Sequence, residues 1–144
     1  MLEDETIYKG QIKNNRINDK NGTIIFPDGS YYKGEIKRGI IEGHGVYIFA
    51  DQTYSYEGQW VKGLPEGDGL EISPCGTYQG SFLKGKKWGK GRLKFEDDSL
   101  FIGSFEDNLI NGYGTFQTKK SIAKGNWVDG FLEGAGVQKY PDGA

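Results

Sequence analysis

The chain has 144 residues, of which 24 are glycine and only 35% are apolar, and its formal net charge is −2. This charge argues against a nucleic-acid partner held by bulk electrostatics. The single cysteine, Cys75, excludes an internal disulfide framework and favours a reducing, cytoplasmic compartment. No run of residues approaches the roughly 20 apolar positions that a helical membrane span requires. The glycine excess and the low apolar content indicate a thin, repetitive all-β protein.

A glycine recurs at the start of each of six repeating units, and in five of them it follows an aromatic residue by two positions. These glycines are Gly10, Gly34, Gly58, Gly80, Gly103 and Gly125, spaced by 24, 24, 22, 23 and 22 residues. After a lead-in at 1–7, the predicted units run roughly over 8–31, 32–55, 56–77, 78–100, 101–122 and 123–144. Units two to six then each carry a second pair of glycines, such as Gly67 and Gly69 or Gly134 and Gly136. Ala123 replaces the opening aromatic residue of the last unit. Motifs that recur once per unit indicate a structural role rather than a catalytic one.

The alternation of side chains within a unit indicates what the glycines do. In the third unit, Tyr56, Gly58 and Trp60 share one face of a first strand, whereas Glu57 and Gln59 lie on the other. When the second strand pairs with the first as an antiparallel hairpin, its two glycines reach the aromatic face. A ring can then lie flat on backbone that has no Cβ. We therefore expect one face of rings and glycines and an opposite face that is mostly polar.

These motifs strongly resemble the MORN (membrane occupation and recognition nexus) repeat. The shared features are Tyr-x-Gly, an aromatic residue or isoleucine two positions later, Gly-x-Gly completed 11 residues after the first glycine, and a Pro-Asp-Gly turn. The resemblance implies a repeat solenoid of about six consecutive antiparallel β-hairpins in one elongated, twisted, curved, single-layer sheet, with a groove rather than an active site. Lys20 replaces a glycine in the first unit, and Glu71 and Ser73 replace apolar residues in the third. These departures indicate local weakness or a specialised contact.

Two groups of apolar residues are candidate partner-binding surfaces, because stacked repeats usually bind along their extended faces. The first group, on the aromatic face, is Tyr56, Trp60, Tyr78, Phe82 and Phe101. The second group, on the face expected to be polar, is Val46, Ile48, Leu70 and Ile72. An exposed contiguous apolar area marks a partner surface. The alternative for the second group is that curvature or a terminal segment covers it.

The fourth unit contains a cluster of basic residues. Six cations fall within eleven positions, and alternation places Lys90, Arg92 and Lys94 on one face. The candidates for binding an anion, such as a phosphoinositide headgroup or an acidic partner segment, are Lys86, Lys87, Lys90 and Arg92. The alternative is a solvated strand whose charges keep the sheet soluble.

The sequence offers no catalytic or metal-binding constellation. The segment from Gly80 to Lys87 has the spacing of a phosphate-binding loop, but lysine stands where that loop needs serine or threonine, and the same spacing recurs in the other hairpins. His44 is the only histidine, and a metal site needs several ligands. We therefore expect no enzyme activity, no cofactor and no metal.

The preferred function is a non-catalytic protein-interaction or scaffold module that presents a groove to an extended or helical partner segment. The resemblance implies scaffolds at the membrane, the cytoskeleton or the cilium. Two alternatives stay open: a targeting or regulatory region of a larger enzyme, such as a lipid kinase or a SET-type methyltransferase, and a module that binds acidic phospholipid. The edge strands could also pair with a second copy to form a homodimer.

Overall fold

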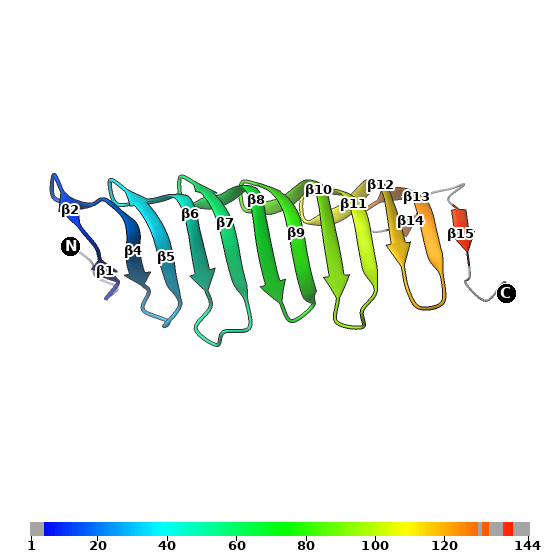
Figure 1. Ribbon diagram of the computed structural model, residues 1–144, viewed down its shortest axis with the longest axis horizontal. Coiled ribbons are helices and arrows are strands. Elements are labelled where there is room, and N and C mark those ends of the chain that lie inside the picture. Colours follow the sequence, from blue (N-terminus) through cyan, green and yellow to red (C-terminus); the bar gives the residue numbers. More distant parts are fainter. Residues whose placement is uncertain (1–4, 130, 133–136, 140–144) are drawn as a thin grey trace.

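One antiparallel sheet contains most of the described part of the chain, which in this computed structural model comprises residues 5–129, 131–132 and 137–139. The sheet has 13 strands in sequential order, with β15 paired to β13 (Figure 1). Its strands are β1 (Ile7–Lys9), β4 (Asp19–Ile25), β5 (Tyr31–Lys37), β6 (Ile40–Ile48), β7 (Ser55–Val61), β8 (Leu64–Ser73), β9 (Gly76–Leu83), β10 (Lys86–Phe95), β11 (Leu100–Glu106), β12 (Leu109–Gln117), β13 (Ile122–Val128), β14 (Phe131–Leu132) and β15 (Val137–Lys139). A separate two-stranded piece contains β2 (Ile12–Lys13) and β3 (Arg16–Ile17). The predicted all-β, single-layer array of hairpins is confirmed.

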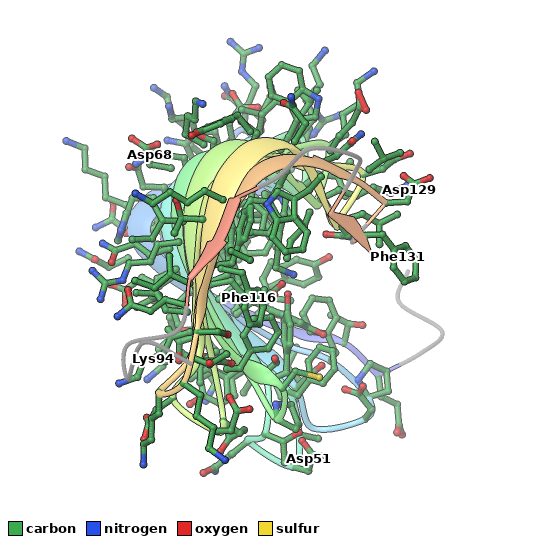
Figure 2. All side chains as sticks on the ribbon, turned by 90° about the vertical axis from the view of Figure 1, so that its right-hand side faces the viewer. Asp51, Asp68, Lys94, Phe116, Asp129 and Phe131 are labelled. Carbon is green, nitrogen blue, oxygen red and sulfur yellow. The ribbon has the colours of Figure 1, made fainter. Side chains whose placement is uncertain are left out.

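The sheet is bent along its strands into an arch. Viewed end-on in Figure 2, Asp51 and Asp129 lie near the two ends of the arch, and Phe116 lies inside it. Asp68 and Lys94 lie outside it. We call the inner side the concave face and the outer side the convex face. The aromatic and glycine positions occupy the concave face, so the predicted division into a ringed face and a polar face follows the two sides of the arch. The predicted glycine pair Gly134 and Gly136 lies outside the described residues.

A row of glycines crosses ten adjacent strands and supports the rings. Its members pair one with the next in the order Gly22, Gly34, Gly45, Gly58, Gly69, Gly80, Gly91, Gly103, Gly114 and Gly125. The ring of Tyr56 lies against Gly58 and Gly69, and a Cβ at Gly80 would be only 2.5 Å from the Cα of Gly91. A side chain at any central position of this row would therefore occupy space that a ring or the paired backbone already fills.

Each of the tyrosines on the glycine row also stabilises an irregularity in its own strand. The register between β7 and β8 shifts between Gly58 and Trp60, and the Tyr56 hydroxyl donates a hydrogen bond to the Gln59 carbonyl inside this shift, at 2.8 Å. Tyr32 and Tyr78 make the same bond in their own hairpins. Burial raises the pKa of Tyr56 to about 12, which keeps the hydroxyl protonated and able to donate. A bulge bends the strand that carries it, so this bond helps to fix the arch.

The buried rings form a continuous chain that joins the hairpins. Successive ring pairs meet edge to face, with centroids between 4.9 and 5.7 Å apart. The order along the chain is Tyr32, Trp60, Tyr56, Phe82, Tyr78, Phe105, Phe101 and Trp127. The indole N–H of Trp60 donates to the carbonyl of Gly45 on the preceding hairpin at 3.0 Å. Neighbouring units thus share one core, as in other one-dimensional repeat proteins.

The two long edges of the ribbon carry different turns. Aspartates begin several turns between hairpins, where they accept hydrogen bonds from the residue two positions later: Asp28 from Ser30, Asp51 from Thr53 and Asp97 from Ser99. These bonds lower the pKa of each carboxyl. The tips within the hairpins follow the upper edge in Figure 1. The first turn residue of five tips is left-handed, with φ of 52°, 50°, 50°, 55° and 49° at Arg38, Lys62, Lys84, Asp107 and Asp129.

Replacement of Gly69 by alanine tests the contact between ring and glycine. The added Cβ would lie 2.5 Å from the Tyr56 hydroxyl oxygen. We expect Gly69→Ala to lower the free energy of unfolding by about 2–3 kcal/mol or more, as overpacking does. Gly63→Ala is the control, because Gly63 has φ of 82° but nothing within 4 Å of a Cβ, so only backbone strain of about 1 kcal/mol applies. Urea unfolding of both variants measures the difference, and equal losses would contradict the steric account.

Candidate binding surfaces

The five aromatic candidates from the sequence form the core. Their exposed fractions are 1% for Tyr56, 6% for Trp60, 1% for Tyr78, 4% for Phe82 and 0% for Phe101. The prediction that they contact a partner therefore needs correction in this conformation: their rings already contact glycine backbone and one another. What the sequence pattern identified at these positions is the packing of the sheet.

A second layer of aromatic residues lies over this core and lines a groove on the concave face. Between the second and third units the groove deepens into a cavity of about 400 Å³, whose walls include Tyr47, Phe49, Tyr54 and Trp60. The side chain of Phe49 is 42% exposed, and its ring lies 4.6 Å from that of Tyr54, centroid to centroid. An apolar cavity with accessible rings is the kind of surface that takes an apolar side chain from a partner. We call this region the concave groove.

A polar cluster begins at Tyr54, which lines this cavity, and continues through Glu71 to Lys87. The Tyr54 hydroxyl donates to one carboxylate oxygen of Glu71 at 2.6 Å, and the Lys87 ammonium pairs with the other at 2.7 Å. The Lys87 and Glu71 side chains are only 16% and 12% exposed. Burial, together with the bond to Glu71, raises the pKa of Tyr54. Lys87 also lies 5.5 Å from the centroid of the Tyr78 ring, so its positive charge is shared between a carboxylate and a ring face.

This arrangement corrects the anion-binding prediction for Lys87. Its ammonium is on the concave face and is neutralised by Glu71, so it does not join Lys90 and Arg92, which are exposed on the convex face. Lys86 is exposed as well, but it pairs with Asp107 at 3.3 Å. The structure thus divides the four predicted anion ligands between two faces and the end of a hairpin. Lys90 and Arg92, together with Lys94, form what we call the convex basic strip.

The apolar candidates of the convex face lie on two strands that do not touch. Val46 and Leu70 flank Glu57 in register, and Ile48 and Ile72 flank Ser55 in the same way. Ile72 is 46% exposed, and the other three are half-buried. The predicted face is therefore correct for these residues, but β7 places polar side chains between them. They do not form one contiguous apolar surface.

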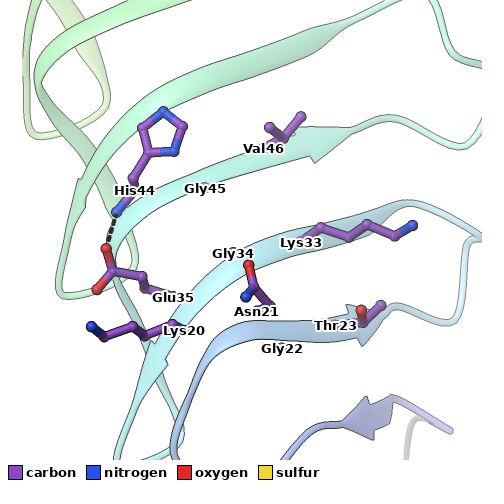
Figure 3. A pocket seen from close by; sticks show the side chains of 10 residues that line it. All are labelled: Lys20, Asn21, Gly22, Thr23, Lys33, Gly34, Glu35, His44, Gly45 and Val46. Atoms are coloured by element: carbon purple, nitrogen blue, oxygen red, sulfur yellow. Dashed lines mark hydrogen bonds between the residues drawn. The ribbon is translucent and has the colours of Figure 1, made fainter.

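Shallow hollows follow the glycine row on the convex face, between the side chains that flank the row. One hollow of about 480 Å³ lies over Gly22, Gly34 and Gly45, with His44 near one end and Lys33 toward the other (Figure 3). The dashed line in Figure 3 is the bond from the His44 backbone N–H to Glu35, at 3.2 Å. Within the described residues, no group of three or more histidine, cysteine, aspartate or glutamate side chains is arranged to hold a metal ion. The same part of the chain contains no helix of the length and apolarity needed to cross a membrane.

Sequence reasoning missed the exposed rings and the ion pair of the concave groove. Strict alternation from Gly91 places Lys87 on the aromatic face, and alternation from Gly69 places Glu71 there too. A lone acid and a lone base on the buried face of successive units are a signal for an ion pair. Phe49 and Tyr54 gave a weaker signal, because they flank a turn whose geometry alternation does not predict.

Removal of Lys87 tests whether Glu71 and Lys87 neutralise each other in the buried ion pair. Lys87→Met leaves the Glu71 carboxylate buried without its cation, and we expect a loss of about 3 kcal/mol in the free energy of unfolding. The double variant Glu71→Leu with Lys87→Ile introduces residue types that equivalent positions carry, as at Leu93 and Ile110, and should come within about 1 kcal/mol of the wild type. Lys86→Met, which breaks an exposed pair, is the control and should cost less than about 1 kcal/mol. Thermal and urea unfolding measure all three, and a double variant as unstable as the single one would contradict this account.

Comparison with known proteins identifies relatives of this chain. The chain is 37% identical to alsin from Rattus norvegicus over 73 residues, which cover 46% of this chain and 4% of alsin. Human alsin is 36% identical over 73 residues. The ALS2 C-terminal-like protein from Homo sapiens is 35% identical over 70 residues, or 44% of this chain and 7% of that protein. The chain thus spans only a small part of the length of these relatives, in which the matched repeats belong to a much larger protein.

The family model of the MORN repeat matches five segments, at residues 32–54, 56–76, 78–99, 101–120 and 124–144. These segments begin at the second predicted unit, so 8–31 as a sixth copy stays a prediction. The matches include the units that carry the glycine row, the ring chain and the concave groove. By these matches and by its fold, the chain belongs to the MORN repeat family, a family of non-catalytic repeat modules.

Proposed function

We propose that the chain is a protein-interaction module whose concave groove holds an apolar, extended or helical segment of a partner protein. The observation that carries this proposal is the cavity of about 400 Å³ beside the half-exposed ring of Phe49. A ring that is accessible in the free module can be buried by a partner, at about 25 cal/mol for each Å² of apolar area removed from water. Such a module would act as a scaffold in the cytoplasm, at the membrane or at the cytoskeleton.

The polar cluster that adjoins the cavity through Tyr54 supports a partner that binds in one register. Apolar side chains fit beside Phe49 and Tyr47, whereas the ion pair of Glu71 and Lys87 requires a polar neighbour or water to complete its hydrogen bonds. A partner segment that places an apolar residue against the ion pair would therefore bind less well. The groove thus combines apolar binding energy with a polar marker of register.

Site-specific photo-crosslinking tests this proposal without knowledge of the partner. A photoreactive phenylalanine analogue at position 49 should capture a partner segment in cells, and the same analogue at Ile102 on the convex face should not. Phe49→Asp should weaken association with the captured protein about tenfold or more, because it places a charge in the apolar site. Circular dichroism and thermal unfolding should show an intact fold, since the Phe49 side chain is 42% exposed.

Equal capture from the two positions, or association with the captured protein that survives Phe49→Asp, would contradict the groove as the binding site. The adducts also report the partner's chemistry, because the crosslinked peptide can be sequenced. An apolar segment with one polar residue at the position of the ion pair is the expected result.

The convex basic strip favours binding of acidic phospholipid as a second candidate function. Lys90 and Arg92 are exposed side by side on one strand, and about 1 kcal/mol per cation is available near an anionic membrane surface. We expect the chain to sediment with phosphatidylserine-containing vesicles but not with phosphatidylcholine vesicles, and Lys90→Glu with Arg92→Glu to abolish the difference. The matched control is Lys9→Glu with Lys33→Glu, which makes the same charge change elsewhere. Sedimentation that is equal for both vesicle types, or equally lost in the control, would exclude a lipid site at this strip.

A further inference from the structure

Exposed apolar side chains gather at the tips of four successive hairpins. At the third tip Val61 pairs with Leu64, and at the sixth Val128 pairs with Phe131. Leu83 at the fourth tip and Leu109 at the fifth complete the row. Their exposed fractions range from 38% at Leu83 to 77% at Phe131. We call this edge, from the third tip to the sixth, the hairpin rim.

The charges of the hairpin rim are divided by position along the ribbon. The third and fourth tips carry only cations, whereas the fifth and sixth carry only anions. The cations are Lys62, Lys84 and Lys86, and the anions are Glu106, Asp107 and Asp129. This apolar row has three positive charges in one half and three negative charges in the other. When a second copy lies antiparallel to the first, the positive half of each copy faces the negative half of the other.

The backbone conformation of the tips indicates that the turn geometry does not by itself favour lysine at these positions. Lys62 and Lys84 occupy the first turn position with φ of 50°, a left-handed conformation that glycine, asparagine and aspartate adopt most easily. Asp107 and Asp129 occupy the same position with residues suited to it, at φ of 55° and 49°. A lysine at this position carries backbone strain, and such strain persists where another role requires the residue.

We propose that the hairpin rim is a two-fold symmetric interface with a second copy of this chain, in which the ribbons lie antiparallel, edge to edge. Successive tips are two strands apart, roughly 10 Å along the ribbon, in each copy. An axis between the fourth and fifth tips therefore brings Lys62 opposite Asp129 of the other copy and Lys84 opposite its Asp107. Symmetry repeats both pairs. The apolar side chains of the four tips then lie along the two sides of this contact, beside the ion pairs.

The existing contacts of these charges leave them available. Asp107 pairs with Lys86 of its own chain at 3.3 Å, but the two side chains are 75% and 55% exposed, so this is a surface pair of small energy. This interface differs from pairing of the edge strands, because it uses side chains on the long edge and adds no strand to β1 or β14.

Sedimentation analysis of the 144-residue chain and two charge-reversed variants tests the proposal. The acidic variant carries Lys62→Asp and Lys84→Asp, and the basic variant carries Asp107→Lys and Asp129→Lys. We expect the wild type to dimerise, more weakly as salt rises, and each variant alone to associate about tenfold or more weakly. An equal mixture of the two variants should restore association as a heterodimer, because two of the four pairs keep their original sign and the other two are re-formed with reversed sign.

The double variant Lys90→Asp with Arg92→Asp is the matched control, since it makes the same charge change as the acidic variant on the convex face and should dimerise like the wild type. Circular dichroism should show an unchanged fold in every variant, because the tips are exposed. A wild type that stays monomeric up to its solubility limit would overturn the proposal, even if it sediments with anionic vesicles through its basic tips. A dimer that ignores the charge reversals, or variants that fail to associate when mixed, would overturn it too. Phe49→Asp should leave the dimer intact, which separates this interface from the concave groove.

Discussion

The contact between an aromatic ring and a pair of facing glycines is the interaction on which this structure depends. Tyr56 illustrates it: the ring lies on Gly58 of its own strand and on Gly69 of the paired strand, and it is 1% exposed although the sheet is a single layer. A single layer normally lacks a second sheet or a helix to cover its apolar residues. Here the backbone serves as the surface against which the rings are buried, and the curvature of the sheet brings neighbouring rings into contact.

This solution determines which parts of the molecule remain for binding. The rings closest to the glycine row are enclosed by their own sheet, so they stabilise the array and offer little surface to a partner. Binding must then use the second aromatic layer, the convex face or the ribbon's edges. Phe49, the convex basic strip and the hairpin rim are three such surfaces, and they face in different directions. A repeat array can therefore carry independent contacts while one core holds it together.

Several residues depart from the repeat pattern at positions where the packing of one unit on the next accepts more than one type of residue. Glu71 and Lys87 replace apolar residues on the concave face of successive units, and each compensates the charge of the other across the unit boundary. Lys62 and Lys84 replace residues that the turn would favour. Neither change improves the regular repeat by itself. Both make one stretch of the ribbon chemically different from the rest, which is what a repeat protein needs in order to bind in a defined register.

The sequence by itself determined the repeat, the strand pairs and the face to which each ring belongs, because spacing and alternation are local properties of the chain. It also placed Val46 and Leu70 on the mostly polar face, which the structure shows to be the convex one. Only the tertiary structure decided that the glycine row brings Tyr56 into the core, that Glu57 separates Val46 from Leu70, and that Lys87 meets Glu71. These facts depend on which strands become neighbours, on the bulges that shift their register and on the direction of the bend. Such features arise from contacts between units, which a pattern read within one unit does not contain.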